Sequence, residues 1–336
     1  MKTETLSSIS ARTGWSITTI SRVLNGKGDK YRIPKSTQEA VMHEVRRCGY
    51  VPAGTAQNLR NGKTGLIGLL LPSVANPFFA DMASVIISEM YKESYTTIVV
   101  DTMEDESYLL ESMKTLLSRQ VEGIIAAPSG EEGLMAEKIN NSLPVVLVDR
   151  YYEGTTLSYV TANNYQGSFD ATEYLIEMGH RRIACLQGAT SSMPNKERVR
   201  GYVEAMKGEG LSDYILLSGN EFSIRNGYLE TKLLLGRREI PTAIFTLSNT
   251  ILLGAIKAIR EAGLRIPEDI SLLTFDDNLY MDYMTPVITR VSQPVDDMAR
   301  LASKLLLDSL SSADRVASQL RLAPALILGE SVRRIR

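Results

Sequence analysis

Polar side chains near the start of the chain have the chemistry of a nucleic-acid contact surface. Between residues 16 and 25, serine and threonine hydroxyls surround a single arginine, Arg22, and the segment ends at Asn25. An arginine guanidinium donates two parallel hydrogen bonds to O6 and N7 of guanine, and short hydroxyl side chains bond bases or phosphates. Residues 16–25 are therefore a candidate DNA-reading segment, and a solvated polar helix face is the alternative.

Groups suited to catalysis or metal binding are few. Neither of the two histidines, His43 and His180, has a nucleophile motif nearby, and we expect a structural role for His180. Cys48 and Cys185 have no metal-ligand spacing with these histidines. The segment 62–64 (Gly-Lys-Thr) is similar to the end of a phosphate-binding loop but lacks its first glycine and a preceding strand. We predict a protein that is not an enzyme and holds neither a metal nor a cofactor.

The charge of the chain is distributed unevenly. Residues 1–63 contain 11 Lys and Arg against 4 Asp and Glu, whereas the whole chain has a net charge of -2. A basic N-terminal region on an acidic body suggests that one end meets a polyanion and the other does not. Charge alone would also fit a solvated basic face.

The composition of the chain limits the classes of protein to which it can belong. The chain has 336 residues, 44% of them hydrophobic and 23% charged, which suits two or three globular domains rather than a disordered or fibrous protein. Two cysteines give no disulfide framework. The first ten residues lack the apolar stretch of a signal peptide, and no apolar run reaches the length of a membrane span. We expect a cytoplasmic protein with no membrane partner.

The N-terminal region has the pattern of three short helices. Apolar periodicity predicts helices over residues 6–12, 17–24 and 34–47, with Ser16 as the N-cap of the second helix. In the second helix, Ile17, Ile20 and Leu24 form an apolar stripe, which leaves an outer polar face made of Thr18, Thr19, Ser21 and Arg22. Two helices joined by a tight glycine-containing turn are typical of a helix-turn-helix, and a plain three-helix bundle is the alternative.

After Gly65 the chain alternates between apolar runs of strand length and amphipathic stretches of helix length. Ten such runs lie between residues 66 and 291. Repeated βα units imply parallel sheets covered by helices, and ten strands are too many for one comfortable core. We therefore predict an α/β body with two lobes and a ligand site in the cleft between them, beyond the carboxyl ends of the strands.

Several motifs, taken in order, carry a resemblance that covers nearly the whole chain. They are LSSISARTGWSITTISRVLN from Leu6 to Asn25, Gly49-Tyr50-Val51-Pro52, Ala56-Gln57-Asn58-Leu59-Arg60, Gly62-Lys63-Thr64-Gly65, Asn76-Pro77-Phe78-Phe79, Val121-Glu122-Gly123-Ile124-Ile125, Val148-Asp149-Arg150, Gly179-His180-Arg181-Arg182-Ile183-Ala184, Arg198-Val199-Arg200-Gly201-Tyr202 and Phe275-Asp276-Asp277. With these segments the chain resembles the lactose-repressor and galactose-repressor family of bacterial transcription factors.

This resemblance implies a fold and a domain organisation. A helix-turn-helix DNA-binding domain would span residues 1–51, a hinge helix or linker 52–64, and a periplasmic-binding-protein-like core for effector binding and dimerisation 65–336. The core would consist of an N-lobe (about 65–161 and 292–322) and a C-lobe (about 162–291 and 323–336). In both lobes a parallel sheet would be flanked by helices.

The resemblance also implies roles in DNA binding. Ile17, Thr18 and Arg22 would reach base edges in the major groove, and the groups that would hold phosphates are Ser16, Thr19, Ser21 and Asn25. Ala56 and Leu59 match the family's hinge helix, which folds on DNA and inserts a leucine into the minor groove. For Leu59, an ordinary linker leucine is the alternative.

For the effector site, the resemblance implies aromatic walls, polar anchors and further hydrogen-bonding groups. These are Phe78, Phe79 and Phe222 as walls, Asp149, Asn163, Arg198 and Asp276 as anchors, and Ser248 and Gln293 as further groups. Carboxylates and a planar guanidinium bond vicinal hydroxyls, so a sugar or related polyol is favoured. The family's usual Asn-Asp pair is replaced here by Ser248-Asn249, which leaves sugar phosphates and nucleobases open.

Three departures from the family pattern concern the N-terminal region. The segment 25–33 is longer than usual and carries Lys27, Lys30, Tyr31 and Arg32, which add phosphate contacts or are simply solvated. Ala53 replaces an asparagine that could cap the hinge helix. Trp15 replaces a smaller apolar residue in the turn, and we expect it to pack.

The resemblance implies a regulator, by family default a repressor, that binds a palindromic double-stranded operator as a homodimer and responds to a small effector. The C-terminal residues carry no leucine-heptad tail, which favours a dimer over a tetramer. The alternative function is a periplasmic-type sugar-binding protein without a role on DNA. The missing signal peptide and the basic N-terminal region disfavour it.

Overall fold

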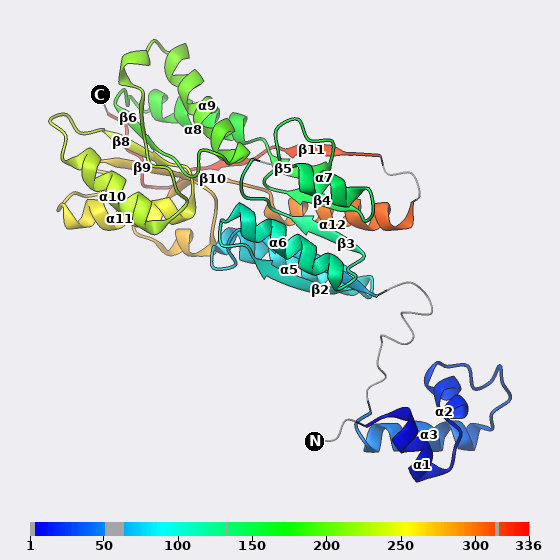
Figure 1. The fold of residues 1–336 in the computed structure, drawn as a ribbon. Helices are drawn as coiled ribbons and strands as arrows, with labels where there is room; N and C mark the ends of the chain where they lie inside the picture. Colours follow the sequence, from blue (N-terminus) through cyan, green and yellow to red (C-terminus); the bar gives the residue numbers. More distant parts are fainter. Residues whose placement is uncertain (1–3, 51–63, 132, 313–315, 336) are drawn as a thin grey trace. The chain divides into compact units, whose positions relative to one another are not determined.

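The chain folds into two units that divide between Thr64 and Gly65. The computed structural model describes residues 4–50, 64–131, 133–312 and 316–335 (Figure 1). We call Met1–Thr64 the N-terminal unit and Gly65–Arg336 the C-terminal unit. The predicted hinge contacts Ala56 and Leu59, and the cap position Ala53, lie outside the described residues.

The N-terminal unit contains helices α1 (Leu6–Thr13), α2 (Ile17–Leu24) and α3 (Lys35–Arg47). Local signals place their ends: the Thr5 hydroxyl accepts a hydrogen bond from the backbone N–H of Ser8, and the Ser16 hydroxyl accepts one from that of Thr19. Between α1 and α2, Gly14 adopts a left-handed φ of 76°, which glycine reaches without steric cost. The predicted N-cap at Ser16 and the extent of the second helix are confirmed.

The core of the N-terminal unit is small and apolar. Its buried members come from all three helices: Ile9, Ile20, Val23, Val41 and Val45. The prediction that Ile17 belongs to the buried stripe is wrong, because its side chain is 45% exposed. Residues 20, 23 and 24 form the face of α2 that packs against the other helices. Ile17 lies in the first turn, at the edge of this face. Trp15 packs against this core, as expected.

Two six-stranded sheets form the C-terminal unit. The N-lobe sheet has the order β11-β5-β4-β3-β1-β2, with β1 (Leu66–Leu71), β2 (Thr96–Asp101), β3 (Gly123–Ala126), β4 (Val145–Val148), β5 (Ser158–Ala162) and β11 (Gln319–Leu322). The C-lobe sheet has the order β12-β10-β9-β8-β6-β7, with β6 (Ile183–Leu186), β7 (Leu216–Ser218), β8 (Ala243–Thr246), β9 (Ser271–Phe275), β10 (Thr289–Ser292) and β12 (Ala325–Ile327). All paired strands run parallel except β10 and β12.

Helices cover both faces of each sheet (Figure 1). In the N-lobe, α5 (Pro77–Lys92) and α12 (Val295–Ser311) pack on one face, and α6 (Glu106–Ser118) and α7 (Leu134–Asn140) on the other. In the C-lobe, α8 (Asn164–Glu177) and α9 (Met193–Gly208) lie opposite α10 (Ile224–Leu235) and α11 (Asn249–Glu261). Short 3₁₀ turns occupy Ser212–Tyr214 and Leu279–Tyr283. The predicted two-lobed α/β body is confirmed.

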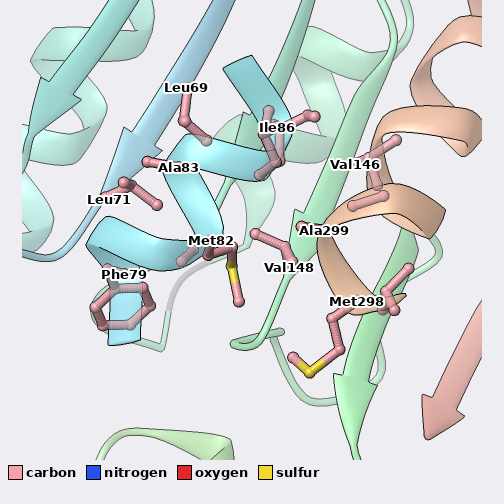
Figure 2. Close-up of a cluster of buried hydrophobic side chains, with 14 of the residues drawn as sticks. Leu69, Leu71, Phe79, Met82, Ala83, Ile86, Val146, Val148, Met298 and Ala299 are labelled. Atoms are coloured by element: carbon pink, nitrogen blue, oxygen red, sulfur yellow. The ribbon is translucent and has the colours of Figure 1, made fainter. Parts of the chain in front are cut away.

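The packing of the N-lobe shows how the sheet positions a residue at the cleft. Met82 and Ile86 of α5 and Met298 of α12 pack over β1 and β4 (Figure 2). Ala83 and Ala299 lie in the same cluster, and their small side chains allow close packing of the helices on the sheet (Figure 2). Phe79, one helical turn before Ala83, belongs to both this core and the cleft described below. Within the described part of the chain, every helix is too short or too polar to span a bilayer.

Candidate functional site

The two lobes repeat the same strand order, so β4 of the N-lobe corresponds to β9 of the C-lobe. An aspartate follows each of these strands at its carboxyl end: Asp149 after β4 and Asp276 after β9. Both have left-handed backbones, with φ of 61° and 75°, and both are buried. Aspartate tolerates this conformation better than most side chains do. The repeated topology therefore brings two carboxylates into one cleft.

Arg198 of α9 faces these carboxylates and is fixed by its surroundings. Its Nε donates to Asn164 Oδ1 at 2.7 Å, and its Nη1 donates to the carbonyl of Leu247 at 2.7 Å. The same Nη1 lies 3.7 Å from Asp276 Oδ1, and the guanidinium carbon lies 3.7 Å from the centre of the Phe275 ring. Burial lowers the pKa of Arg198, and the two aspartates oppose this. The guanidinium is held in one orientation before any ligand arrives.

Asp149 is the less satisfied of the two carboxylates. Burial raises its pKa to about 6, although Arg198 and Arg150 act in the opposite direction. Its Oδ1 has no hydrogen-bond partner among the described residues. Leaving a buried polar atom unpaired costs free energy, so such an atom in a cleft points to a polar ligand.

Asp276 is tied into the protein more firmly. Its Oδ1 accepts from Gln293 Nε2 at 2.7 Å, and its Oδ2 accepts from the backbone N–H of Asn249 at 3.2 Å. Gln293 Oε1 and Ser192 Oγ are both buried without a partner among the described residues. Together with Asp149, these side chains leave two acceptors and one hydroxyl unused around Arg198.

Aromatic side chains from both lobes complete the cleft. The rings of Phe78 and Phe79 meet edge to face, with centroids 5.0 Å apart. The guanidinium carbon of Arg150 lies 5.5 Å from the Phe79 ring centre and 5.3 Å from that of Phe222 in the C-lobe. Glu104 pairs with this arginine through both carboxylate oxygens, at 2.5 and 2.8 Å. The cleft thus has apolar faces beside its charged groups.

The structure brings together all but one of the residues predicted for the effector site. Those that line the cleft are Phe78, Phe79, Asp149, Arg198, Phe222, Ser248, Asp276 and Gln293. Asn163 is not among the residues that line it: its side chain caps α8 by accepting from the Gln166 N–H, and its role in ligand binding stays a prediction. The adjacent Asn164 is the residue that bonds Arg198. Sequence reasoning missed the remaining lining residues, Asn76, Arg150, Ser192 and Pro194, although Asn76 and Arg150 belong to motifs already quoted.

The lobes are closed around a small cavity. Its volume is about 20 Å³, which suits a single water molecule rather than a sugar. Besides the contact of Arg150 with Phe222, polar contacts cross between the lobes from Asn249 Nδ2 to Asn76 Oδ1 at 3.2 Å and from Lys196 Nζ to Glu131 Oε1 at 2.7 Å. A larger ligand can enter only if the lobes part.

The side chains of the cleft are suited to binding a polar ligand. A guanidinium and two carboxylates can bond several hydroxyl groups, and the phenylalanine rings can cover the C–H face of a sugar. Among the described residues, no group of three or more His, Cys, Asp or Glu side chains could hold a metal. His180 lies elsewhere and is buried between the Thr242 hydroxyl (2.9 Å) and the Arg333 carbonyl (3.1 Å), so both ring nitrogens are occupied. This contact supports the structural role expected for it.

In the N-terminal unit, the candidate DNA residues divide by exposure. Ser16, Ile17 and Thr18 are exposed, and the residues that are half-buried are Thr19, Ser21, Arg22 and Asn25. Several of them also stabilise α2 itself. The Ser16 and Thr19 hydroxyls lie 2.8 Å apart, and Asn25 Nδ2 donates to the Ser21 carbonyl at 2.6 Å. The exposed first turn of α2 is the part that is open to a partner.

Ion pairing separates two groups of cations in the N-terminal unit. Arg12 and Arg47 pair with Glu44, and Lys35 pairs with Asp29. In the described part of this unit, no carboxylate pairs with the cations of α2 and the following loop, which are Arg22, Lys27, Lys30 and Arg32. Unpaired positive charge beside exposed hydroxyls is the arrangement that a phosphate backbone attracts.

Comparisons with known proteins agree with this geometry. Residues 172–332 match the periplasmic binding protein-like domain family. A ribose operon repressor of Haemophilus influenzae is 30% identical over 320 residues, covering 94% of this chain and 95% of the relative. A LacI family transcriptional regulator of Enterococcus faecium with bound ribose is 26% identical, with a TM-score of 0.74 over 81% of this chain and 100% of that one. The lac repressor dimer bound to operator shares the fold, with a TM-score of 0.85 at 23% identity over 99% of this chain and 100% of that one.

Proposed function

The chain belongs to the lactose-repressor/galactose-repressor (LacI/GalR) family of DNA-binding transcriptional regulators, and from this premise we propose that it is a dimeric, effector-controlled repressor. In this proposal the N-terminal unit reads a palindromic operator in the cytoplasm, and a small polyol binds between the N-lobe and the C-lobe. The proposal extends the family assignment to named residues of this chain.

One observation carries the DNA part of the proposal. Most of the cations that lack a carboxylate partner in the described N-terminal unit lie on α2 and the loop after it, where Ile17 and Thr18 are exposed; Arg46 of α3 is the exception. Ile17, Thr18 and Arg22 then contact base edges, and Ser16, Thr19, Ser21 and Asn25 contact phosphates. Exposure of Ile17 supports an apolar contact with a thymine methyl group. We keep the minor-groove role of Ala56 and Leu59 as part of the proposal.

The polar atoms of the cleft support a neutral polyol as effector. Asp149 Oδ1 and Gln293 Oε1 accept from ligand hydroxyls, the Arg198 guanidinium donates to ligand oxygens, and Ser192 Oγ does either. Two buried aspartates face Arg198, and the second arginine of the cleft, Arg150, is already paired with Glu104, so the remaining charge disfavours a phosphate dianion and favours a sugar over a sugar phosphate. The regulator of Enterococcus faecium that holds ribose is consistent with this class. A nucleobase is the second candidate, because the Phe78, Phe79 and Phe222 rings could also cover a flat ring.

Control of DNA binding follows from closure of the lobes. An effector changes DNA affinity only if it binds one closure state better than the other, with a coupling free energy of typically about 1 to 3 kcal/mol. Because the closed cleft holds only about 20 Å³, a sugar alters the distance between the lobes when it binds. This displacement is the signal that the N-terminal unit receives in the proposed mechanism.

Exposed apolar side chains support the homodimer. Ile87 and Tyr91 lie one turn apart on α5, and Tyr91 is 79% exposed. In the C-lobe, the apolar side chains of Ile256, Leu264 and Met284 line a groove of about 700 Å³. Exposed apolar side chains with charged residues around them are typical of protein interfaces, and we propose that a second copy of this chain covers them. Sedimentation of wild type and of a Tyr91→Asp variant tests this, with a shift of the variant toward monomer as the expected result.

Deleting residues 1–63 tests whether DNA binding and sugar binding belong to separate parts of the chain. The truncated chain is expected to lose binding to duplex DNA and to keep binding a sugar, measured by calorimetry with ribose and other pentoses and hexoses. The alternative, a periplasmic-type binding protein without a DNA role, predicts that the intact chain binds no duplex at all. The repressor match over 94% of the chain disfavours that alternative, because it must include most of the N-terminal unit.

A further inference from the structure

The loop between α2 and α3 contacts the candidate base-reading arginine directly. The guanidinium carbon of Arg22 lies 3.8 Å from the centre of the Tyr31 ring. Tyr31 is 44% exposed, and neither residue has an ion-pair or hydrogen-bond partner for its side chain in the described structure. Arg22 and Tyr31 therefore form a stacked cation–π pair on the surface of the N-terminal unit. The N–H groups of the guanidinium and the hydroxyl of the ring remain free to bind a partner.

The loop that carries Tyr31 is held in one conformation by side-chain hydrogen bonds. Asp29 accepts from Gln38 Nε2 through Oδ1 and from Lys35 Nζ through Oδ2, both at 2.9 Å. Gln38 Nε2 also donates to the carbonyl of Ile33 at 2.8 Å. Gly28 is buried beneath Gln38, and a β-carbon there would lie 2.3 Å from the amide carbon of that side chain. The first turn of α3 thus fixes the loop.

Backbone hydrogen bonds connect this loop to α2. The N–H of Lys27 donates to the carbonyl of Arg22 at 2.9 Å, and the N–H of Tyr31 donates to the carbonyl of Lys27 at 3.1 Å. The N–H of Ile33 closes the loop on the carbonyl of Gly28 at 2.9 Å. Tyr31 is therefore tied through two successive bonds to the residue whose side chain it covers.

We propose that Tyr31 is a positioning residue for base readout, which holds the Arg22 guanidinium ready to contact guanine. This inference rests on the DNA-binding function proposed above. Stacking uses the face of the guanidinium, whereas the bidentate contact with O6 and N7 uses N–H groups at its edge, so the two interactions are compatible. A long side chain that is already ordered loses less conformational freedom when it binds. The extended loop then contributes specificity, beyond the charge of its lysines.

The test is binding of the full-length chain to a labelled duplex that this chain selects from a randomised pool, at one fixed salt concentration. Each G·C pair of that duplex is then replaced by A·T in turn. Tyr31→Ala is expected to weaken binding about three- to tenfold and to reduce discrimination at the base pair that Arg22 reads. Tyr31→Phe keeps the ring and is expected to stay within about twofold of wild type. Tyr31→Leu keeps bulk without a π face and is expected to resemble Tyr31→Ala.

A double-mutant cycle isolates the coupling. In an Arg22→Ala background, Tyr31→Ala is expected to cause no further loss, because the group that it positions is gone. Gln38→Ala releases the loop from α3 and is expected to reproduce part of the Tyr31→Ala effect. Circular dichroism and thermal unfolding of the variants check folding, and Tyr31 is absent from the apolar core of the N-terminal unit.

Two results would overturn the inference while leaving the proposed function intact. Equal loss for Tyr31→Phe and Tyr31→Ala would assign the effect to a hydroxyl–phosphate contact. Additive losses for Arg22→Ala and Tyr31→Ala, with unchanged discrimination between base pairs, would separate the two residues. Failure of the wild-type chain to bind any duplex would instead overturn the proposed function together with the inference.

Discussion

Asn249 Nδ2 at the start of α11 lies 3.2 Å from Asn76 Oδ1 at the start of α5, so the two lobes are joined by the amides of two helix N-termini. The same Nδ2 lies 2.6 Å from Asn278 Oδ1, and the backbone N–H of Asn249 bonds Asp276. Asn76 and Asp276 both line the cleft. Ligand contacts and lobe closure therefore share the same side chains, which gives a physical route by which occupancy of the cleft changes the closure equilibrium.

Ser192→Ala is expected to weaken sugar binding without destabilising the fold. Ser192 is the N-cap of α9, but its hydroxyl makes no capping bond, and Oγ has no partner in the described structure. The usual stability cost of losing a cap, about 1 kcal/mol, therefore does not apply. Loss of one hydrogen bond to the ligand is expected to weaken binding by about 0.5 to 1.5 kcal/mol in calorimetric titration.

Ser303→Ala is the matched control for this prediction. Ser303 of α12 also has a buried hydroxyl without a partner in the described structure, but it does not line the cleft. Ser303→Ala is expected to leave sugar affinity unchanged. Equal effects of the two substitutions would remove Ser192 from the ligand site.

Sugar affinity is expected to fall at acidic pH because of Asp149. Its pKa is raised to about 6, so the carboxylate that accepts from ligand hydroxyls becomes protonated as the pH falls through this value. The contribution to folding has the opposite sign: a raised pKa stabilises the fold below 3.8, and this gain is lost as the pH rises through about 6. Calorimetric titrations between pH 5 and 8 measure the first effect. In Asp149→Asn the pH dependence should disappear, and its persistence would point to another group.

His180 is expected to make folding stability depend on pH. Burial lowers its pKa from 6.5 to about 4, so the unfolded chain takes up a proton between these values and the folded chain does not. Stability from this group is present above pH 6.5 and is lost as the pH falls toward 4, by roughly 2 kcal/mol at pH 5. Urea unfolding at pH 7.5 and pH 5 measures it. A His180→Gln variant that kept the full difference would assign the dependence to other residues.

Arg22 and Lys30 are expected to differ in what they contribute to DNA binding. Arg22→Ala is expected to cost about 1 to 3 kcal/mol and to relax preference at one base position. Lys30→Ala removes a cation with no carboxylate partner in the described structure, so it should weaken all duplexes alike and reduce the salt slope by about one. Anisotropy titrations over a salt series separate the two. Uniform losses for Arg22→Ala on every sequence would exclude it from base readout.

Much of the fold could be predicted because it depends on local signals. The Ser16 cap, the glycine-containing turn and the alternation of apolar runs with amphipathic stretches mark most of the helices and strands. The pattern does not predict β11, whose alternate residues are exposed and include Arg321, because a short edge strand buries too little surface to stand out. Helix α7, with seven residues, is too short for a clear periodicity.

The strand pattern could predict only those residues of the candidate site that lie directly at the ends of strands. Asp149 and Asp276 follow buried strands directly, so their meeting in the cleft follows from topology. Asn163 and Asn164 differ by one residue at a helix start, which no periodicity resolves. The stacking of Tyr31 on Arg22 depends on the conformation of a loop that only the structure gives. Arg198 also stabilises the fold: removing it would leave Asp276 buried without its cation and Asp149 with Arg150 alone, which is destabilising.

The most direct test of the central claim is selection of a randomised duplex pool by the full-length protein at near-physiological salt, with and without a panel of sugars, sugar phosphates and nucleobases. The account predicts enrichment of a palindromic motif whose recovery changes in the presence of a neutral sugar. Absence of any enriched sequence under every condition would contradict the account and leave a small-molecule-binding protein without a role on DNA.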